Sequence, residues 1–491
     1  MSIHHIVSQL ETFADSPAVL TPDGTITTYA QLARLAGEIA ANIPARNLVF
    51  CLCRNALPSL AGYVAALTHD IVPLMLDAAL PQERLAELAR TFCPDFLWLP
   101  EELAASHASP LGCEPAGYSL MGYSLVRVTA KPTHTAPLHP DLGLLVTTSG
   151  STGSPRLVRQ TLANIKANAD SIADYLRLGP EERPITTLPM HYVYGMSVIN
   201  SHLAVGACLL LTDETIMQRA FWDFAAQARA TSLSGVPYTY EMLDRLLFHR
   251  RNLPELRTLT QAGGKLNPDL QEKFAQFAQK TGKQFYVMYG ASEATSRMGY
   301  LPPELALAKK GAIGKAIPGG AFSLVDEQGQ EIAQADAVGE LVYAGPNVAM
   351  GYAENRADLA RGDDWQGVLH TGDMAKRDAD GIYYIVGRKK RFLKIFGNRV
   401  SLDAVDALLR GRFPELECAS TGRDDLLAVA LAMGTALTPE QTEIRAEAIR
   451  SFLAGQTRLN PAAFRIVQLP ALPRNAAGKI RYQELATLCA V

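Results

Sequence analysis

From residue 144 to residue 156 the chain reads Leu144-Leu145-Val146-Thr147-Thr148-Ser149-Gly150-Ser151-Thr152-Gly153-Ser154-Pro155-Arg156, a short apolar run followed by hydroxyls and glycines. Glycines let a backbone approach a polyphosphate closely, while Ser and Thr hydroxyls and backbone N–H groups donate to its oxygens. The Gly-Lys-Ser/Thr ending of a Walker P-loop is missing. We therefore predict a strand that leads into an anion-binding loop of another type. A solvated linker is the alternative reading of such a segment.

The same alternation of buried strand and helix extends outward from this stretch. Short apolar runs at 208–211 and 285–288 are each followed by small or polar residues, as buried strands of an α/β sheet require. Helical apolar patterns occur between such runs at 163–176, 221–230 and 269–281. We predict an α/β fold of stacked layers through the first three quarters of the chain.

A change of composition marks the predicted domain boundary. After 381–386 the sequence turns abruptly basic at Gly387-Arg388-Lys389-Lys390-Arg391. The remainder contains a helical pattern at 402–409, a strand pattern at 426–432 and another helical pattern at 439–454. We predict a large N-terminal domain of residues 1–387 and a small, mobile α+β domain of residues 388–491.

Composition excludes several classes of protein. The 491 residues are 48% hydrophobic and 19% charged with a formal net charge of −3, a balance typical of a globular chain with no general affinity for nucleic acid. No stretch of about 18 apolar residues and no signal peptide is found, so we expect a cytosolic protein without membrane insertion. The seven cysteines lack the paired spacings of zinc sites. The basic cluster after residue 387 leaves a nucleic-acid patch as a disfavoured alternative.

Seven more motifs accompany the loop in a fixed order, and together they identify a family. They are Thr28 to Leu32, Gln261 to Leu266, Tyr289-Gly290-Ala291-Ser292-Glu293, Gly339 to Leu341, Thr371-Gly372-Asp373, Gly387-Arg388 and Pro473 to Ile480. The set resembles the adenylate-forming superfamily of acyl- and aryl-CoA synthetases, amino-acid adenylation domains and luciferases. The resemblance spans nearly the whole chain and implies an ATP- and Mg²⁺-dependent acid ligase.

The resemblance assigns residues to the nucleotide. Tyr289 would stack on adenine, while Asp373 and Arg388 would hold the ribose. Glu293 would bind Mg²⁺, and the Ser292 hydroxyl would donate to the α-phosphate. The other implied nucleotide-binding residues are Thr148, Ser149, Gly150, Ser151, Thr152, Gly153, Arg156, Gly264 and Gly290.

The resemblance also implies a catalytic lysine and a hinge. Attack of a carboxylate on the α-phosphorus brings two anions together, and the ammonium of Lys479 would offset that charge. A solvated surface lysine is the alternative for Lys479. Lys390 matches the family hinge, about which the C-terminal domain would rotate to allow a second half-reaction.

Three positions depart from the family pattern. Arg156 stands in place of a Lys, and Leu157 in place of a Gly, at the end of the phosphate loop, which keeps the charge but reduces backbone freedom. The stretch from Asp403 to Asp406 replaces one that usually contains Glu, a change that bears mainly on domain packing.

The acid-binding pocket is expected around residues 188–197. Amino-acid adenylation domains place an Asp where this chain has Gly195, and an unpaired buried ammonium is costly, so an α-amino acid is disfavoured. His191 resembles an entrance or catalytic residue of acyl and aryl ligases, with an ordinary core histidine as the alternative. The mixed aromatic, hydroxyl and small character of the candidates fits an aryl or medium acyl acid. The candidate substrate residues are His191, Tyr194, Met196, Ser234, Gly235, Tyr238, Gly263 and Ala291.

The leading hypothesis is a stand-alone ligase that transfers the acyl group to CoA or to the phosphopantetheine of a separate acyl carrier protein. An amino-acid:carrier-protein ligase and a non-catalytic nucleotide- or acyl-binding regulator remain as alternatives.

Overall fold

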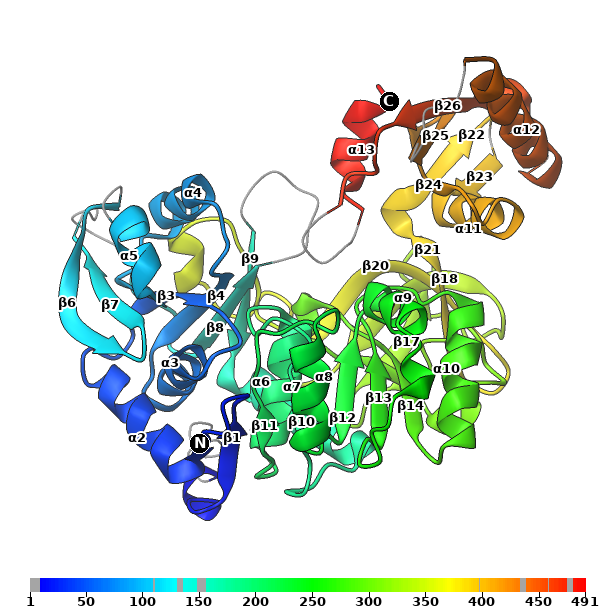
Figure 1. Cartoon of the computed structure of the whole chain (residues 1–491). Helices are drawn as coiled ribbons and strands as arrows, with labels where there is room; N and C mark the ends of the chain where they lie inside the picture. Colours follow the sequence, from blue (N-terminus) through cyan, green and yellow to red (C-terminus); the bar gives the residue numbers. More distant parts are fainter. Residues whose placement is uncertain are drawn as a thin grey trace. The chain divides into compact units, whose positions relative to one another are not determined.

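The computed structural model describes residues 9–108, 111–129, 136–147, 156–396, 398–432, 439–457, 459–474 and 480–491, and Figure 1 shows their elements. The chain divides into two compact units. The first comprises the described residues up to 147, those from 156 to 322, and Tyr343–Leu369. The second comprises residues 323–342 and the described residues from His370 to the C-terminus.

The first unit contains an eight-stranded sheet whose central strands are parallel and buried on both faces. Every residue of β3 is buried, which is why its sequence is an uninterrupted apolar run. β8 ends at Thr147 and so leads directly into the predicted phosphate loop. The strand order is β19 (Gly351–Ala353), β9 (Leu157–Thr161), β8 (Leu142–Thr147), β4 (Val72–Asp77), β3 (Leu48–Cys53), β5 (Phe96–Pro100), β7 (Tyr123–Val128) and β6 (Cys113–Leu120).

A nine-stranded sheet forms the rest of the framework of this unit. Its strands β12, β13 and β14 are parallel and in register, so that Gly235 pairs with Gln261 and Gln261 with Val287. The turns that follow these strands therefore emerge at one edge. The strand order is β16 (Lys315–Ala316), β15 (Gly299–Leu301), β14 (Gln284–Tyr289), β13 (Thr258–Gln261), β12 (Ser232–Gly235), β10 (Pro184–Ile185), β11 (Leu209–Leu210), β1 (Pro17–Leu20) and β2 (Ile26–Thr28).

Helices cover these sheets. α2 (Tyr29–Ala40) begins with a capping box in which Thr28 and Gln31 satisfy each other's backbone N–H groups. The remaining helices are α3 (Leu57–Thr68), α4 (Gln82–Phe92), α5 (Glu101–Ala108), α6 (Leu162–Leu176), α7 (Val193–Leu203), α8 (Arg219–Gln227), α9 (Pro237–Arg245) and α10 (Pro268–Lys280). Short 3₁₀ helices occur at η2 (Phe248–Arg250), η3 (Ser292–Ala294), η4 (Pro303–Leu305) and η5 (Ala357–Ala360).

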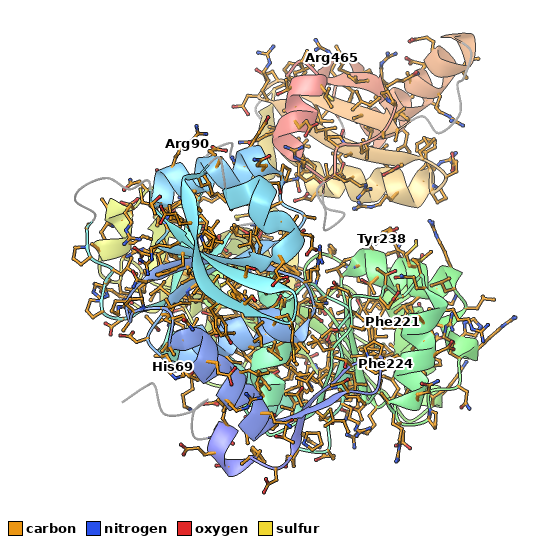
Figure 2. All side chains as sticks on the ribbon, turned by 60° about the vertical axis from the view of Figure 1, so that its left-hand side comes forward. His69, Arg90, Phe221, Phe224, Tyr238 and Arg465 are labelled. Carbon is orange, nitrogen blue, oxygen red and sulfur yellow. The ribbon has the colours of Figure 1, made fainter. Side chains whose placement is uncertain are left out.

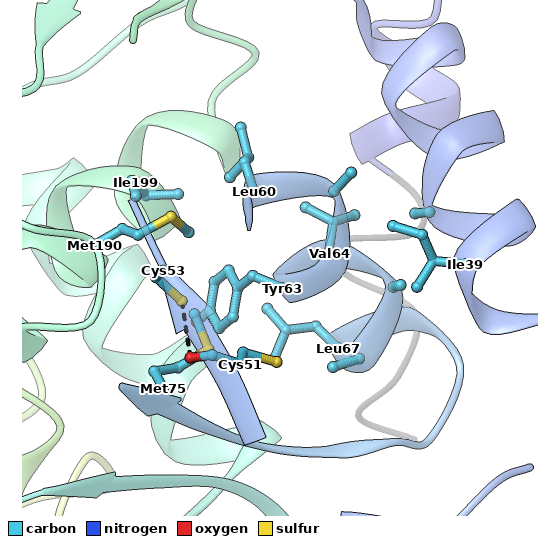
Figure 3. Packing of buried hydrophobic residues seen from close by; sticks show 14 of the residues in the cluster. Ile39, Cys51, Cys53, Leu60, Tyr63, Val64, Leu67, Met75, Met190 and Ile199 are labelled. Atoms are coloured by element: carbon cyan, nitrogen blue, oxygen red, sulfur yellow. Dashed lines mark hydrogen bonds between the residues drawn. The ribbon is translucent and has the colours of Figure 1, made fainter. Parts of the chain in front are cut away.

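Two helices, α3 and α7, are buried on all sides. Residues from Leu57 to Leu67 in α3, and every residue of α7, are buried. They share one hydrophobic cluster with the two sheets, in which Tyr63 of α3 lies beside Cys51 and Cys53 of β3 and Ile199 of α7 lies beside Met190 (Figure 3). A helix that is apolar all round belongs in a core, which explains the absence of a polar stripe on α3.

The second unit is built from three small sheets. The four-stranded sheet, most of whose residues belong to this unit, has the order β17 (Ala321–Val325), β18 (Val338–Ala344), β20 (Val368–Arg377) and β21 (Tyr383–Arg388). A hairpin of β22 (Phe392–Ile395) and β23 (Asn398–Ser401) follows, and then a sheet of β24 (Glu417–Arg423), β25 (Leu426–Ala432) and β26 (Phe464–Leu469). The helices are α11 (Leu402–Arg412), α12 (Pro439–Thr457) and α13 (Tyr482–Leu488), with η6 (Lys389–Arg391) and η7 (Pro461–Ala463).

The predicted fold class, α/β layers followed by a smaller α+β part, is confirmed. The predicted domain boundary at residue 387 and the mobility of the C-terminal domain stay predictions. Within the described ranges, no helix has the length and apolar character needed to cross a membrane.

Candidate active site

The turn after β13 is shaped by two glycines. Gly263 has a φ of +82°, and a Cβ at this position would lie 2.6 Å from Tyr192 Oη, so only glycine fits there. The turn is held from below by Gln261, whose fully buried Nε2 donates to the Gly264 carbonyl at 2.9 Å. The glycines and the Gln261 hydrogen bond therefore fix the backbone of the predicted adenine-side turn.

The loop after β14 folds back tightly on itself. A Cβ on Gly290 would lie 1.6 Å from the carbonyl oxygen of Ser296, and Ser296 N donates to Ala291 O at 3.2 Å. Ser296 itself has a φ of +126°, a region that a residue with a Cβ rarely adopts. The close return of the chain thus requires the glycine of the Tyr289-Gly290 pair.

Asn347 holds the same loop from the outside. Its side chain is 2% exposed, and Nδ2 donates to the carbonyls of Ala294 at 2.8 Å and Arg297 at 3.0 Å. Tyr343 Oη donates to Asn347 Oδ1 at 2.7 Å, which fixes the orientation of the amide. The 3₁₀ turn that carries Ser292 and Glu293 is therefore rigidly positioned.

Glu293 meets the end of the phosphate loop through Tyr352. Tyr352 Oη donates to Glu293 Oε1 at 2.6 Å, and the guanidinium carbon of Arg156 lies 3.9 Å from the centre of the Tyr352 ring. Antiparallel pairing of β19 with β9, in which Tyr352 is opposite Val158, brings these groups together. A cation that follows the loop and a carboxylate suited to Mg²⁺ thus lie at the same tyrosine.

In the second unit, Asp373 and Arg388 are directly opposite each other on β20 and β21. Arg388 Nε lies 2.6 Å from Asp373 Oδ1, and the aspartate side chain is 5% exposed while the arginine is 61% exposed. Thr371 Oγ1 accepts from Asp373 N at 3.0 Å and donates to Leu341 O at 2.7 Å. The two residues predicted to hold the ribose are therefore neighbours.

A second ion-pair cluster is centred on Arg391, the last residue of η6. Arg391 Nε is 2.6 Å from Asp403 Oδ1, and its Nη2 is 2.8 Å from Asp406 Oδ2. The guanidinium also stacks on Tyr482, 3.7 Å from the ring centre. Burial raises the pKa of Asp406 to about 6, against the opposing effect of Arg391. Asp403 and Asp406, which lie in the stretch that departs from the family pattern, thus hold Arg391, the residue after Lys390. The side chain of Lys390 itself lies outside the described part.

Comparison with known proteins decides the family. Residues 7–353 match the model of the family described as AMP-binding enzyme. The chain belongs to the AMP-binding enzyme family.

Two relatives and one solved structure agree with this family assignment. Indoleacetate–CoA ligase of Aromatoleum aromaticum is 27% identical over 490 residues, which cover 94% of this chain and 93% of that protein. Oxalate–CoA ligase of Arabidopsis thaliana is 29% identical over 358 residues, or 71% and 68% of the two chains. The structure of O-succinylbenzoate coenzyme A synthetase (MenE) from Bacillus subtilis with AMP has a TM-score of 0.79 at 19% identity, over 98% of this chain and 97% of that chain, which shows a common fold. The family prediction is confirmed.

ATP and Mg²⁺, the ligands that such a family implies, fit the described residues. Asp373 presents a buried carboxylate, and Gly263 and Gly264 contribute only backbone to the predicted adenine-side turn. Among the described residues, no group of three His, Cys, Asp or Glu side chains is arranged to hold a metal ion. Magnesium in nucleotide sites commonly takes one or two carboxylates together with phosphate oxygens, so the single carboxylate of Glu293 is enough. When bound, the ion would supply positive charge to the departing pyrophosphate.

Several of the predicted site residues belong to segments that the structure does not describe. Thr148, Ser149, Gly150, Ser151, Thr152 and Gly153 lie outside the described residues, as does Lys479. On either side of the latter, Arg474 and Ile480 form an antiparallel bridge. The roles assigned to these residues stay predictions.

The predicted acid-pocket residues lie in four different settings. Tyr194, Met196, Ser234 and Gly235 are buried in the first unit, and Gly263 and Ala291 lie on turns that follow β13 and β14. Tyr238 is 57% exposed on the first turn of α9 (Figure 2). His191 Nε2 is 3.9 Å from Asp77 Oδ2, and burial lowers the pKa of His191 below its ordinary value while Asp77 opposes this. Its Nδ1 is buried and has no hydrogen-bond partner among the described residues, so the neutral imidazole is favoured.

Sequence reasoning missed Tyr352, Asn347 and Arg297. None falls in a motif, and each acts on a residue distant in sequence, such as Glu293, which is 59 residues from Tyr352. The local sequence indicates such a residue only when a polar side chain stands beside an apolar stretch. Arg297 is such a case, because Met298-Gly299-Tyr300-Leu301 follows it.

Proposed function

We propose that this protein uses ATP to convert a carboxylic acid into an acyl-adenylate, releasing pyrophosphate, and then transfers the acyl group to the thiol of CoA. The observation that carries the proposal is the contact of Tyr352 with both Arg156 and Glu293. It joins the cation at the end of the phosphate loop to the magnesium-binding carboxylate. Both charges are needed when a carboxylate attacks a polyphosphate.

The named relatives support this reaction. Those compared above are CoA ligases of carboxylic acids, indoleacetate and oxalate. The MenE structures include complexes with ATP and magnesium ion and with an acyl-adenylate intermediate, with TM-scores of 0.76 and 0.78. The predicted activity, adenylate-forming acid–thiol ligation with ATP and Mg²⁺, is confirmed at this level. CoA as the preferred acceptor, a cytosolic location and the individual residue roles are parts of the proposal.

We assign a role to each of the candidate residues. In the first unit, Tyr289 and the Gly263-Gly264 turn receive the base, Ser292 donates to the α-phosphate, and Glu293 binds the metal ion. In the second unit, Asp373 accepts from the ribose hydroxyls, with Arg388 holding the carboxylate in place. Lys479 offsets the charge that develops as the acid attacks.

The position of Gly195 disfavours an α-amino acid as substrate. A Cβ on Gly195 would lie 2.3 Å from the Pro189 carbonyl oxygen, so this backbone has no room for the aspartate that amino-acid adenylation domains carry there. An ammonium brought into this pocket would need another anion.

The first half-reaction is tested by acid-dependent exchange of labelled pyrophosphate into ATP, with Mg²⁺ and panels of aryl, aliphatic and amino acids. We expect exchange with aryl or medium acyl acids, and exchange with amino acids alone would select the alternative ligase. Glu293→Gln should abolish the response to Mg²⁺. Glu354→Gln, which removes another carboxylate near Arg156 at 3.4 Å, is the matched control and should retain it.

The acceptor is tested by offering CoA and a phosphopantetheinylated carrier protein separately. We expect thioester formation with CoA. Folded protein that binds ATP but catalyses no exchange with any acid would contradict the proposal and favour a regulatory protein.

A further inference from the structure

Arg297 is a buried cation with only neutral partners. The residue is 2% exposed, and its Nε donates to Ser197 Oγ at 3.2 Å and its Nη1 to Tyr175 Oη at 3.0 Å. Nη1 also lies 3.3 Å from Met288 Sδ, and the guanidinium carbon lies 5.0 Å from the ring centre of Tyr194. Across the part of the chain that the structure describes, no carboxylate lies within ion-pair distance of this arginine.

Two other buried arginines, Arg159 and Arg391, each have a carboxylate partner. The side chain of Arg159 is fully buried, and its Nη2 lies 2.6 Å from Asp364 Oδ2. Arg391, 11% exposed, has both Asp403 and Asp406. Burying a guanidinium without an opposite charge is unfavourable, because its hydration is lost and no ion pair compensates. An anionic or strongly accepting ligand that binds beside Arg297 would supply the missing compensation.

The surroundings of Arg297 join it to the predicted acid pocket. Tyr194, whose ring faces the guanidinium, bonds through its hydroxyl to Thr260 Oγ1 at 2.9 Å. Thr260 Oγ1 in turn bonds to Ser234 Oγ at 2.8 Å. Tyr194 and Ser234 are two of the substrate residues predicted from the sequence. Arg297 therefore belongs to the same cluster.

The strand register places this cluster inward of the reacting end. Ser234 pairs with Thr260 one residue before the last residue of each strand, and Met288 is likewise the residue before the end of β14. Ligands of open α/β sheets bind beyond the carboxyl ends of the strands, where the Gly263 and Tyr289 turns lie. An acid whose carboxyl group is activated at those turns would direct its far end toward Arg297.

The region around Arg297 is polar rather than alkyl-like. α6 and α7 pack against each other, and both helices carry buried polar residues. Among the residues that the structure describes, four side-chain atoms of these helices are buried without a hydrogen-bond partner: Asn168 Oδ1, Ser171 Oγ, Asn200 Oδ1 and His202 Nε2. Unsatisfied polar groups disfavour a plain hydrocarbon chain here and favour an oxygen-bearing group or water.

We propose that Arg297 determines the substrate class, and that the acid carries a second oxygen acceptor, a carboxylate or a phenolic hydroxyl, at the end remote from the reacting carboxyl. The inference rests on the proposed function, because it concerns the acid of the same reaction. The planar guanidinium binds a carboxylate with two parallel hydrogen bonds and a phenol oxygen with one.

The test measures kcat/KM for pyrophosphate exchange with matched acids: benzoate, 4-hydroxybenzoate and terephthalate, and hexanoate and adipate. We expect an acid with a distal oxygen to exceed its unsubstituted partner by about 10-fold or more. Arg297→Met should bring the two members of each pair to within about 3-fold of each other. Arg297→Lys should restore part of the advantage. The two arms, hydroxyl and carboxylate, show which acceptor is preferred.

A purely structural role for Arg297 is separated by stability. Arg159→Met removes a buried ion pair with Asp364 and hydrogen bonds to the carbonyls of Met350 and Gly362, and should lower the melting temperature of the ligand-free protein. Arg297→Met removes an uncompensated charge and should not. The preferred acid should raise the melting temperature of the wild type but not of Arg297→Met. Equal destabilisation by both variants, with all acids slowed alike, would overturn the inference.

The outcomes separate the two proposals. Exchange that is as fast with unsubstituted acids as with their distal-oxygen partners would overturn the inference and leave the proposed function standing. An absence of exchange with any acid would remove the proposed function and the inference with it.

Discussion

Tyr352 donates a hydrogen bond of 2.6 Å to Glu293 Oε1, across 59 residues of sequence. The same ring stacks on Arg156 and meets Trp365 edge-on, with ring centres 4.9 Å apart. The tyrosine therefore holds the carboxylate in one orientation before any metal ion binds. Groups that orient a metal ligand from behind contribute to metal affinity as well as to geometry.

Tyr352→Phe should weaken the response to Mg²⁺ while the ring contacts with Arg156 and Trp365 remain. Loss of a hydrogen bond to a metal ligand commonly costs about 10-fold in metal affinity. We expect the Mg²⁺ concentration for half-maximal exchange to rise about 10-fold at saturating acid and ATP. An unchanged Mg²⁺ dependence would show that Tyr352 does not orient Glu293.

Gly290→Ala should disable the site through the backbone. The added methyl would lie 1.6 Å from Ser296 O, a contact that no side-chain movement relieves. Displacement of the turn by about 1 Å would misplace Ser292 and Glu293, and we expect exchange to fall about 100-fold. Gly37→Ala is the control, because its Cβ meets nothing within 4 Å in the middle of α2. That change should keep activity and raise the free energy of unfolding by about 0.5 to 1 kcal/mol.

The sequence predicts the framework well because its signals are local. The strand expected at 426–432 is β25 (Leu426–Ala432), and the helix expected at 439–454 is α12 (Pro439–Thr457), one turn longer. Apolar runs that end in small or polar residues are sufficient to identify buried strands. The roles of Glu293 and Asp373 were predicted from family motifs contained within a few residues, and they stay predictions.

Local sequence patterns do not predict contacts between residues that are far apart in the chain. Asn347 binds the Arg297 carbonyl 50 residues away, and no spacing or periodicity in the sequence connects them. Arg297 was missed because its lack of a counter-charge is a property of packing, not of neighbours in sequence. The second compact unit already includes residues 370–387, because β21 contacts α11 and Arg388 N donates to Asp403 Oδ2 at 3.0 Å, which joins these strands to the chain that follows.

His202 should make the first unit sensitive to acid. The residue is 3% exposed, and burial, together with the charge of Arg297, lowers its pKa to about 4. Above pH 6.5 the imidazole is neutral in both the folded and the unfolded chain. As the pH falls toward 4, only the unfolded chain takes up the proton, so stability decreases on acidification. We expect a loss of about 2 kcal/mol between pH 7 and pH 5 from this group.

His202→Gln should remove that loss. Denaturant melts at pH 7 and pH 5 give the difference in unfolding free energy for the wild type and the variant. His69→Gln, at an exposed histidine labelled in Figure 2, is the control and should keep the pH dependence of the wild type. Equal acid sensitivity of wild type and His202→Gln would assign the effect to other groups.

Lys479→Ala should separate the two half-reactions. The lysine offsets charge only where the carboxylate attacks phosphorus, so its loss should slow pyrophosphate exchange about 100-fold. Thioester formation from a supplied acyl-adenylate and CoA involves no such attack, and should change by less than about 3-fold on the same grounds. Arg481→Ala removes a cation two residues away that pairs with Glu484 at 2.6 Å, and should leave both reactions intact. If Lys479→Ala slows both half-reactions equally, the lysine serves the fold or the nucleotide in general, and rotation about Lys390 would lose its main support.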